Sequence, residues 1–269
     1  MDHNTPGEAK PTFADVRSQT GAWERGWKRV EIAGRPADVF VPDAANALRG
    51  VVVFLHDFDA RTLRESDVFT AELARHGLAA VCPIADRCWW TTAPCPDFDP
   101  AVSPLQFVRE SVVPFVKERW HIEPPAIGLL GIGMGGQGVL QLAYRWPREF
   151  PVVAAIAPAV DFHNWHGYGL SLDRMYPSKE SARQETVTLH IHPLNWPKHQ
   201  YFCCDPADEY WFEGTERLAM KLSSMGIPFE RDLSTTAGGH TWTYFKHMAQ
   251  PTLAFIANHL VRSAVPGNE

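Results

Sequence analysis

Short apolar runs alternate with stretches of helical periodicity along most of the chain. The run at 51–55 is made of β-branched, aromatic and leucine residues, a composition typical of a strand buried on both faces. Similar runs predict further strands at 78–84, 126–132, 152–156, 201–204 and 229–233. Ahead of them, 27–32 and 36–41 predict an opening β-hairpin.

Between these strands, apolar residues recur with helical spacing. The helix predicted at 62–76 ends before Gly77, a residue suited to a left-handed helix cap. Further helices are predicted at 99–120, 137–146, 211–225 and 243–261. Pro104 and Pro114 predict an irregular start and a kink in the first of these. The alternation predicts an α/β fold, with a mostly parallel sheet, helices on both faces and ligands at the carboxyl ends of the strands.

The domain organisation follows from the same pattern. A single domain is predicted at 21–262, preceded by a polar segment at 1–20 and followed by a tail at 263–269. The stretches 85–100 and 161–199 are too long to be simple connections and are rich in Trp, Tyr and His. We therefore expect them to form lid-like insertions over a pocket.

Charge and cysteine content narrow the classes of partner. The chain has 269 residues, with 25 Lys and Arg against 31 Asp and Glu, a net charge of −6 and no basic block, which argues against nucleic-acid binding. No apolar run approaches the roughly 20 residues of a membrane span, and the first residues lack the apolar core of a secretory signal. We expect a cytoplasmic protein without a membrane partner, and the sequence leaves homo-oligomer formation open. Five cysteines without a CxxC pair predict buried thiols and no disulfide.

A glycine-rich turn joins the strand predicted at 126–132 to the helix that follows it. The sequence GIGMG at 131–135 has the spacing of the nucleophile elbow G-x-S-x-G, but Gly133 stands at its centre. In that motif the nucleophile sits on a strained turn, and the next backbone N–H, here that of Met134, faces the developing oxyanion. The turn is therefore predicted, whereas its hydroxyl is missing.

An acidic loop and a histidine follow in the chain order of a hydrolase triad. The sequence CCDPADE at 203–209 offers Asp205, Asp208 and Glu209, and GGHTW presents His240 between two glycines and the closing helix. A triad needs a carboxylate to orient the histidine ring and to stabilise its protonated form. These residues are thus candidates for the acid and the base.

With these motifs, the chain from about 51 to 260 resembles the esterase D-like group of α/β-hydrolases, which includes S-formylglutathione hydrolases and feruloyl-type esterases. The resemblance implies hydrolysis of carboxylic esters through an acyl-enzyme, without a cofactor. It also implies Asp208 as the triad acid, His240 as the general base and the N–H of Met134 in the oxyanion hole. The other two carboxylates of the acidic loop are the next choices for the acid.

Two departures from the family pattern concern the reacting groups. Gly133 stands where the family carries serine, and loss of a triad serine costs about 10⁶ in kcat. Asp57 follows His56 where the family usually has a His-Gly oxyanion loop. We expect the backbone N–H groups of Asp57 and Phe58 in the oxyanion hole, where the Asp57 carboxylate opposes an oxyanion unless it is turned away. Asp57 is also a minor candidate as a base for water.

Aromatic and histidine residues of the loops are candidates for the pocket wall: His56, Trp89, Trp90, His163, Trp165 and Trp242. The spacing of His163 with His166, and of His190 with His192, is found in zinc sites, but the sequence names no further ligand. We therefore expect no metal. Cys203 and Cys204 are expected to pack in the core rather than to act as nucleophiles.

Three functions fit these residues. The first, which we prefer, is an esterase scaffold that binds a small ester or related acyl compound but is inactive or very weak toward esters. The others are base-catalysed chemistry by His240 with Asp208, and a binding protein with a vestigial pocket. On the first hypothesis Gly133→Ser restores hydrolysis at a folding cost of about 1 to 3 kcal/mol. The sequence does not distinguish a natural loss of the serine from its replacement in the laboratory.

Overall fold

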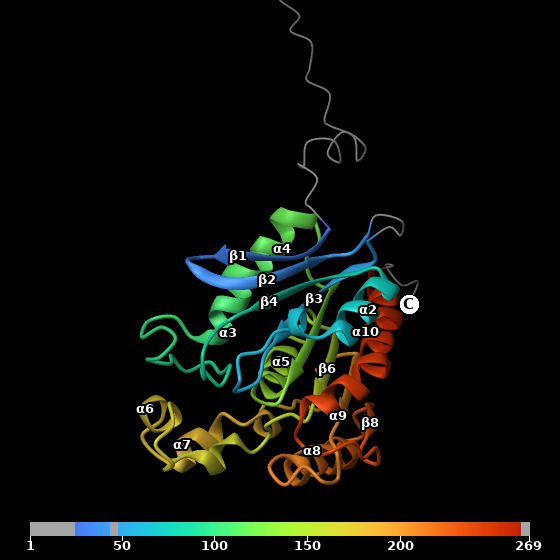
Figure 1. Ribbon diagram of the computed structural model, residues 1–269. Helices are drawn as coiled ribbons and strands as arrows, with labels where there is room; N and C mark the ends of the chain where they lie inside the picture. The colour runs from blue at the N-terminus through green and yellow to red at the C-terminus, as the bar shows by residue number, and fades with distance from the viewer. Residues whose placement is uncertain (1–24, 44–47, 265–269) are drawn as a thin grey trace, which may run out of the picture.

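The computed structural model describes residues 25–43 and 48–264, and one eight-stranded sheet runs through this part of the chain (Figure 1). The sheet order is β1-β2-β4-β3-β5-β6-β7-β8; β1, β2 and β4 pair antiparallel, and the remaining pairs are parallel. Every predicted strand is present. The bounds are β1 Gly26–Ile32, β2 Arg35–Val41, β3 Gly50–Leu55, β4 Leu78–Pro83, β5 Ile127–Ile132, β6 Val152–Ile156, β7 His199–Cys203 and β8 Glu230–Asp232.

Nine α-helices lie among the described residues. Seven of them overlap the predicted helical stretches at 62–76, 99–120, 137–146, 211–225 and 243–261. The bounds are α2 Asp67–His76, α3 Pro104–Phe107, α4 Val113–Trp120, α5 Met134–Arg145, α6 Leu172–Met175, α7 Lys179–Gln184, α8 Phe212–Ser224, α9 Trp242–His247 and α10 Ala249–Ala264. Gly77 caps α2 in the left-handed conformation, with φ 64°, as its sequence predicts.

The helix predicted at 99–120 is confirmed over 104–120, where the chain is helical without a break but is irregular, as its two prolines predict. It consists of three consecutive parts. The first, α3, begins only at Pro104, where Ser103 caps it by accepting a hydrogen bond from the Gln106 N–H. A π-helical turn at Val108–Val112 then precedes α4. Pro114, near the start of α4, lacks the N–H that an uninterrupted helix would use at that point.

The closing helix predicted at 243–261 and the start of the helix predicted at 62–76 are also corrected. The closing segment is two helices, α9 and α10, separated at Met248. The earlier segment opens as a 3-10 turn at Leu63–Glu65. Ser66 then begins α2, because its side chain accepts a hydrogen bond from the Phe69 N–H.

Glycines on β5 let helices lie close to both faces of the sheet. A Cβ added to Gly128 would lie 2.7 Å from Ile256 of α10, whereas one added to Gly131 would collide with the backbone of Gly135 in α5. Because side chains alternate between faces along a strand, α10 and α5 cover opposite faces. The parallel core of the sheet is therefore buried on both sides, as its continuous apolar strands require.

The excursion at 161–199 is built from short helices rather than open loop. It contains α6 and α7, which Figure 1 places at the same end of the molecule as α8. Phe162, Leu172, Ala182 and Val187 are buried, so the segment carries its own apolar contacts. None of the helices in the described residues combines the length and the apolar character that a bilayer crossing requires.

Candidate active site

The turn after β5 has the tight geometry that a nucleophile elbow requires. Gly133 adopts φ 52° and ψ −116°, in the region of positive φ that a side-chain-bearing residue enters only with strain. A Cβ on Gly135 would collide with the carbonyl oxygen of Leu55, at the end of β3. The start of α5 therefore lies directly against the end of β3, where the chain continues into His56 and Asp57.

The side chain of Asp57 fills the space that a serine side chain would take at position 133. A Cβ added to Gly133 would lie within 2.5 Å of three carboxylate atoms of Asp57. Oδ1 of Asp57 accepts a hydrogen bond of 2.8 Å from the Met134 N–H, and Oδ2 lies 2.8 Å from Nε2 of His240. The carboxylate is therefore turned toward the oxyanion donor and not away from it. A serine at position 133 requires the Asp57 side chain to move, so recovery of hydrolysis by Gly133→Ser depends on that movement.

The other side of the His240 ring is held by Asp208. Nδ1 of His240 lies 2.8 Å from Oδ2 of Asp208, and the side chain of Asp208 is fully buried. The second oxygen of Asp208 accepts hydrogen bonds from the N–H groups of Tyr210 and Trp211, at 2.9 and 3.1 Å. These contacts fix the carboxylate, and the carboxylate in turn fixes the ring.

His240 is consequently clamped between two carboxylates. Burial on its own would lower the pKa of the imidazole, but hydrogen bonds to Asp208 and to Asp57 outweigh burial and raise the pKa to about 9. At neutral pH both ring nitrogens then carry protons and donate, one to each carboxylate. A histidine in this state is an acid rather than a base.

The other two acidic candidates have different places. Asp205 accepts hydrogen bonds from the N–H groups of Ala207, Ala237 and Gly239, at 2.7, 2.6 and 2.9 Å, and so ties the acidic loop to the loop that carries His240. Burial opposes ionisation of Asp205, yet these three donors hold the pKa of its carboxyl below the ordinary value. Glu209 is exposed to solvent. Neither side chain contacts the His240 ring.

A cavity of about 220 Å³ opens over Asp57 and His240. Its wall is largely aromatic: Phe58, Trp89, Trp165, Tyr210 and Trp211. The rings of Phe58 and Trp89 meet edge to face at 4.5 Å, and Trp165 packs against Tyr210 and Trp211 at 5.7 and 5.8 Å. Sequence reasoning missed Tyr210 and Trp211, although both directly follow the acidic loop, and it assigned Phe58 a backbone role where the structure shows its ring.

Four residues predicted for the pocket wall do not line this cavity. His56 is buried below it, where burial lowers the pKa of its ring and Nε2 accepts a hydrogen bond from the Ala85 N–H at 2.9 Å. Trp90 donates its indole N–H to the His56 carbonyl at 3.0 Å, and Trp242 donates to Asp59 at 2.7 Å. His163 also lies outside the cavity wall. The structure thus gives these four residues other contacts, and of the predicted wall it places Trp89 and Trp165 at the cavity.

The tryptophan pair lies on strained backbone. Trp89 and Trp90 have φ of 58° and 45°, values that non-glycine residues adopt only where the surroundings enforce them. The buried amide of Gln137 on α5 donates to the Trp89 carbonyl and lies 3.3 Å from that of Trp90. The Trp89 N–H points to the sulfur of Met134 at 3.1 Å. The first turn of α5 therefore fixes both the Met134 N–H and one wall of the cavity.

The histidine pairs and the cysteines lie apart from this site. His166 contacts the Tyr176 carbonyl at 3.0 Å, and His190 contacts Arg145 at 2.8 Å. Across residues 25–43 and 48–264, no three His, Cys, Asp or Glu side chains form a group that could hold a metal ion. All five cysteines are buried free thiols, and burial raises the pKa of both Cys203 and Cys204, which opposes a nucleophilic role.

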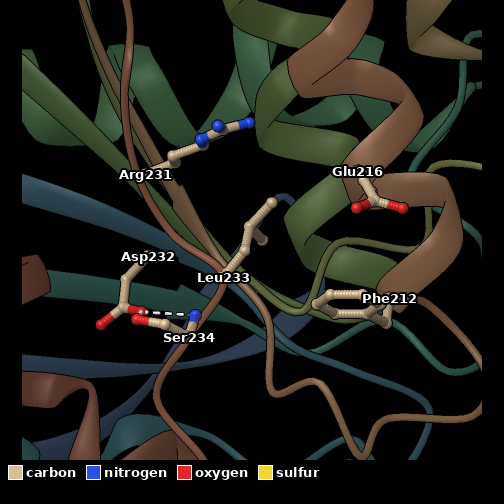
Figure 2. Close-up of a pocket in the computed structure, with 6 residues that line it drawn as sticks. All are labelled: Phe212, Glu216, Arg231, Asp232, Leu233 and Ser234. Carbon is tan, nitrogen blue, oxygen red and sulfur yellow. Dashed lines mark hydrogen bonds between the residues drawn. The ribbon is translucent and has the colours of Figure 1, made fainter.

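A second hollow, of about 450 Å³, lies at the β8 edge of the sheet (Figure 2). Figure 2 shows Glu216, Arg231 and Asp232 around it, with Asp232 accepting a hydrogen bond from the Ser234 N–H at 2.9 Å. Arg231 and Glu216 are exposed to solvent. The hollow contains none of the predicted site residues and no buried reactive group, so the cavity over Asp57 is the candidate active site.

Comparison with known proteins identifies a family and solved structures of similar fold. A sequence profile of the family described as "Putative esterase" matches residues 91–256, more than half of the chain. An S-formylglutathione hydrolase from Agrobacterium tumefaciens is similar in structure, with a TM-score of 0.71 and 15% identity over 87% of this chain and 94% of that one. No curated protein sequence matches the chain.

Two further solved structures have a similar fold. A ferulic acid esterase gives a TM-score of 0.68 at 15% identity, over 87% of this chain and 99% of its own. An S-formylglutathione hydrolase from Staphylococcus aureus gives 0.66 at 14% identity, over 83% of this chain and 93% of its own. At such identities the likeness establishes the fold, and the profile match establishes the family. The chain therefore belongs to this esterase family and has the α/β-hydrolase fold.

Proposed function

We propose that the chain binds a small ester or a related aromatic compound in the cavity over Asp57, and that hydrolysis through a serine acyl-enzyme is closed to it. The observation that carries this proposal is the Asp57 carboxylate in the space of the serine side chain. Family membership and the aromatic cavity wall support a small apolar ligand.

Three requirements of serine hydrolysis are unmet at once. The nucleophile is absent at Gly133, and the Met134 N–H, which would stabilise a substrate oxyanion, already binds Asp57. The base is also disabled, since His240, with a pKa raised to about 9, is protonated at neutral pH. Each deficit alone lowers the rate by orders of magnitude.

The fit between positions 57 and 133 supports a natural origin for Gly133. A serine in the otherwise unchanged chain would collide with the Asp57 carboxylate where it now lies. An aspartate that occupies this space and binds the Met134 N–H supports a scaffold that has left serine chemistry.

The test is a set of four chains: the protein as it is, Gly133→Ser, Asp57→Gly, and the double variant. Asp57→Gly restores the His-Gly sequence of the family and vacates the space beside position 133. With p-nitrophenyl acetate and p-nitrophenyl benzoate as substrates, we expect activity only in the double variant, at least about 10³-fold above the others. Thermal melting of each variant verifies that it folds.

Two outcomes would contradict the proposal. If Gly133→Ser alone is as active as the double variant, Asp57 does not block the site. If the unaltered protein hydrolyses these esters at the rate of the double variant, serine chemistry has a substitute here. Binding is measured separately, by quenching of tryptophan fluorescence with benzyl benzoate, and Trp165→Ala is expected to weaken it by about tenfold.

A further inference from the structure

We propose that Asp57 is a nucleophile toward saturated carbon, and that the cavity accepts alkyl or benzyl compounds bearing an anionic leaving group such as a halide or a sulfonate. This inference rests on the proposed function, because it places the ligand in the same cavity. It concerns a reaction rather than binding alone, and it gives the carboxylate at the centre of the site a direct role.

The position of Asp57 fits a reacting group. Its carboxylate lines the cavity, its side chain keeps 12% of its surface exposed, and the absence of a Cβ at Gly133 leaves it room. Two hydrogen bonds, from Met134 and His240, fix both oxygens without closing the cavity over them. Carboxylates act as covalent nucleophiles when they are held in this way beside an acid-base group.

The occupied oxyanion donor decides between two kinds of electrophile. Attack on an acyl carbon would place negative charge on a substrate oxygen, but the Met134 N–H is already bonded to Asp57. Displacement at saturated carbon needs no such donor, because the charge leaves with the departing group. The Met134 N–H then has a second use. When water attacks the alkyl ester of Asp57, negative charge develops on the Asp57 oxygen to which this N–H donates.

The reaction balances in two stages. An oxygen of the Asp57 carboxylate forms a bond to the substrate carbon as the bond to the leaving group breaks, giving an alkyl ester of Asp57 and a free anion. Water then adds to Cγ of Asp57, the bond between Cγ and the ester oxygen breaks, and an alcohol departs. The sum is alkyl compound plus water giving alcohol, anion and one proton, and Asp57 is regenerated with one oxygen from water.

His240 would change roles between these stages. While Asp57 is charged, burial lowers the pKa of His240 less than the two carboxylates raise it. Alkylation removes the charge of Asp57, so the pKa falls and the ring releases its proton to solvent. The neutral ring can then take a proton from the attacking water through Nε2, the atom that lies 2.8 Å from Oδ2 of Asp57.

The cavity wall suits the organic part of such a substrate. The surrounding rings, Phe58, Trp165 and Trp211, favour an aromatic or alkyl chain rather than a charged one.

The first experiment measures bromide release from 2-phenylethyl bromide. We expect release above the spontaneous rate for the unaltered protein and a loss of at least about 10³-fold in Asp57→Asn. Asp59→Asn is the matched control, since Asp59 lies two residues away outside the cavity wall, and its rate should stay within about twofold. Release no faster than the spontaneous reaction would overturn the inference.

The second experiment follows atoms and does not depend on a variant. After many turnovers in ¹⁸O-labelled water, mass spectrometry of the peptide that contains Asp57 should show the label in its carboxylate. In His240→Gln the alkyl ester should persist on the same residue. Bromide release with label only in the alcohol and none in Asp57 would show direct attack by water and overturn the inference. Ester hydrolysis by the four chains altered at positions 57 and 133 tests the proposed function separately. Failure of the proposed function is therefore distinguishable from failure of this inference.

Discussion

Replacing Asp57 by asparagine removes one of the two negative charges that retain the proton of His240. Although burial lowers it, the pKa of His240 is raised to about 9, which corresponds to about 3 kcal/mol. The two hydrogen bonds have equal length, 2.8 Å each, and the Asp57 and His240 side chains are 12% and 16% exposed. Loss of one charge should therefore lower the pKa of His240 by about 1 to 2 units.

The same proton links stability to pH. Because the pKa of His240 is raised in the folded state, its contribution is fully present below pH 6.5 and is lost as the pH rises toward 9. The free energy of unfolding, relative to His240→Gln, should fall by about 3 kcal/mol across that window. In Asp57→Asn the fall should be smaller and should end at a lower pH.

The assay is NMR titration of the histidine ring protons, with His240→Gln identifying the resonance, together with urea unfolding at pH 6 and pH 9.5. Asp59→Asn is the control for a carboxylate that does not contact the ring. If the pKa of His240 is the same with aspartate and asparagine at position 57, the ion pair does not hold the proton. If the stability difference is flat between pH 6.5 and 9, the linkage is refuted.

Three further predictions follow from single contacts. Asp205→Ala leaves three backbone N–H groups without an acceptor and should lower the free energy of unfolding by about 2 to 4 kcal/mol in urea; a loss below 0.5 kcal/mol would contradict the clamp. Gly135→Ala places a Cβ against the Leu55 carbonyl and should destabilise by about 3 kcal/mol or more, whereas Gly226→Ala, with open space around it, should cost about 1 kcal/mol; equal melting temperatures would refute the close approach. Trp165→Ala should weaken binding of aromatic ligands with little change in melting temperature, because the ring is only partly buried.

Local pattern was enough to predict the sheet. The β-branched run at 51–55 and the strand at 152–156 are buried on both faces, and their composition alone indicates this. Gly77 marks the end of α2 because only a left-handed residue suits that cap. The turn at Gly133 was predicted from the spacing of three glycines, and at all three a Cβ would meet neighbouring atoms in the structure.

Contacts between distant residues could not be predicted in this way. Asp57 and Gly133 are 76 positions apart, and no periodicity relates a carboxylate in one loop to a missing Cβ in another. The same holds for Asp205, whose carboxylate accepts hydrogen bonds from backbone N–H groups in two loops. The π turn before Pro114 could not be predicted for a different reason. It depends on how α3 and α4 pack, which a proline alone does not specify.

The interlocking of Asp57 with Gly133 constrains the order in which such a site can arise. In a serine ancestor, an aspartate at position 57 could not hold its carboxylate where it lies here, because both side chains would claim the same volume. Loss of the serine side chain opens the space that the carboxylate fills. A serine regained while Asp57 is present has to displace that carboxylate. Aspartate at position 57 and glycine at position 133 therefore belong together in this site. A search for proteins with the same change should look for the pair rather than for either substitution alone.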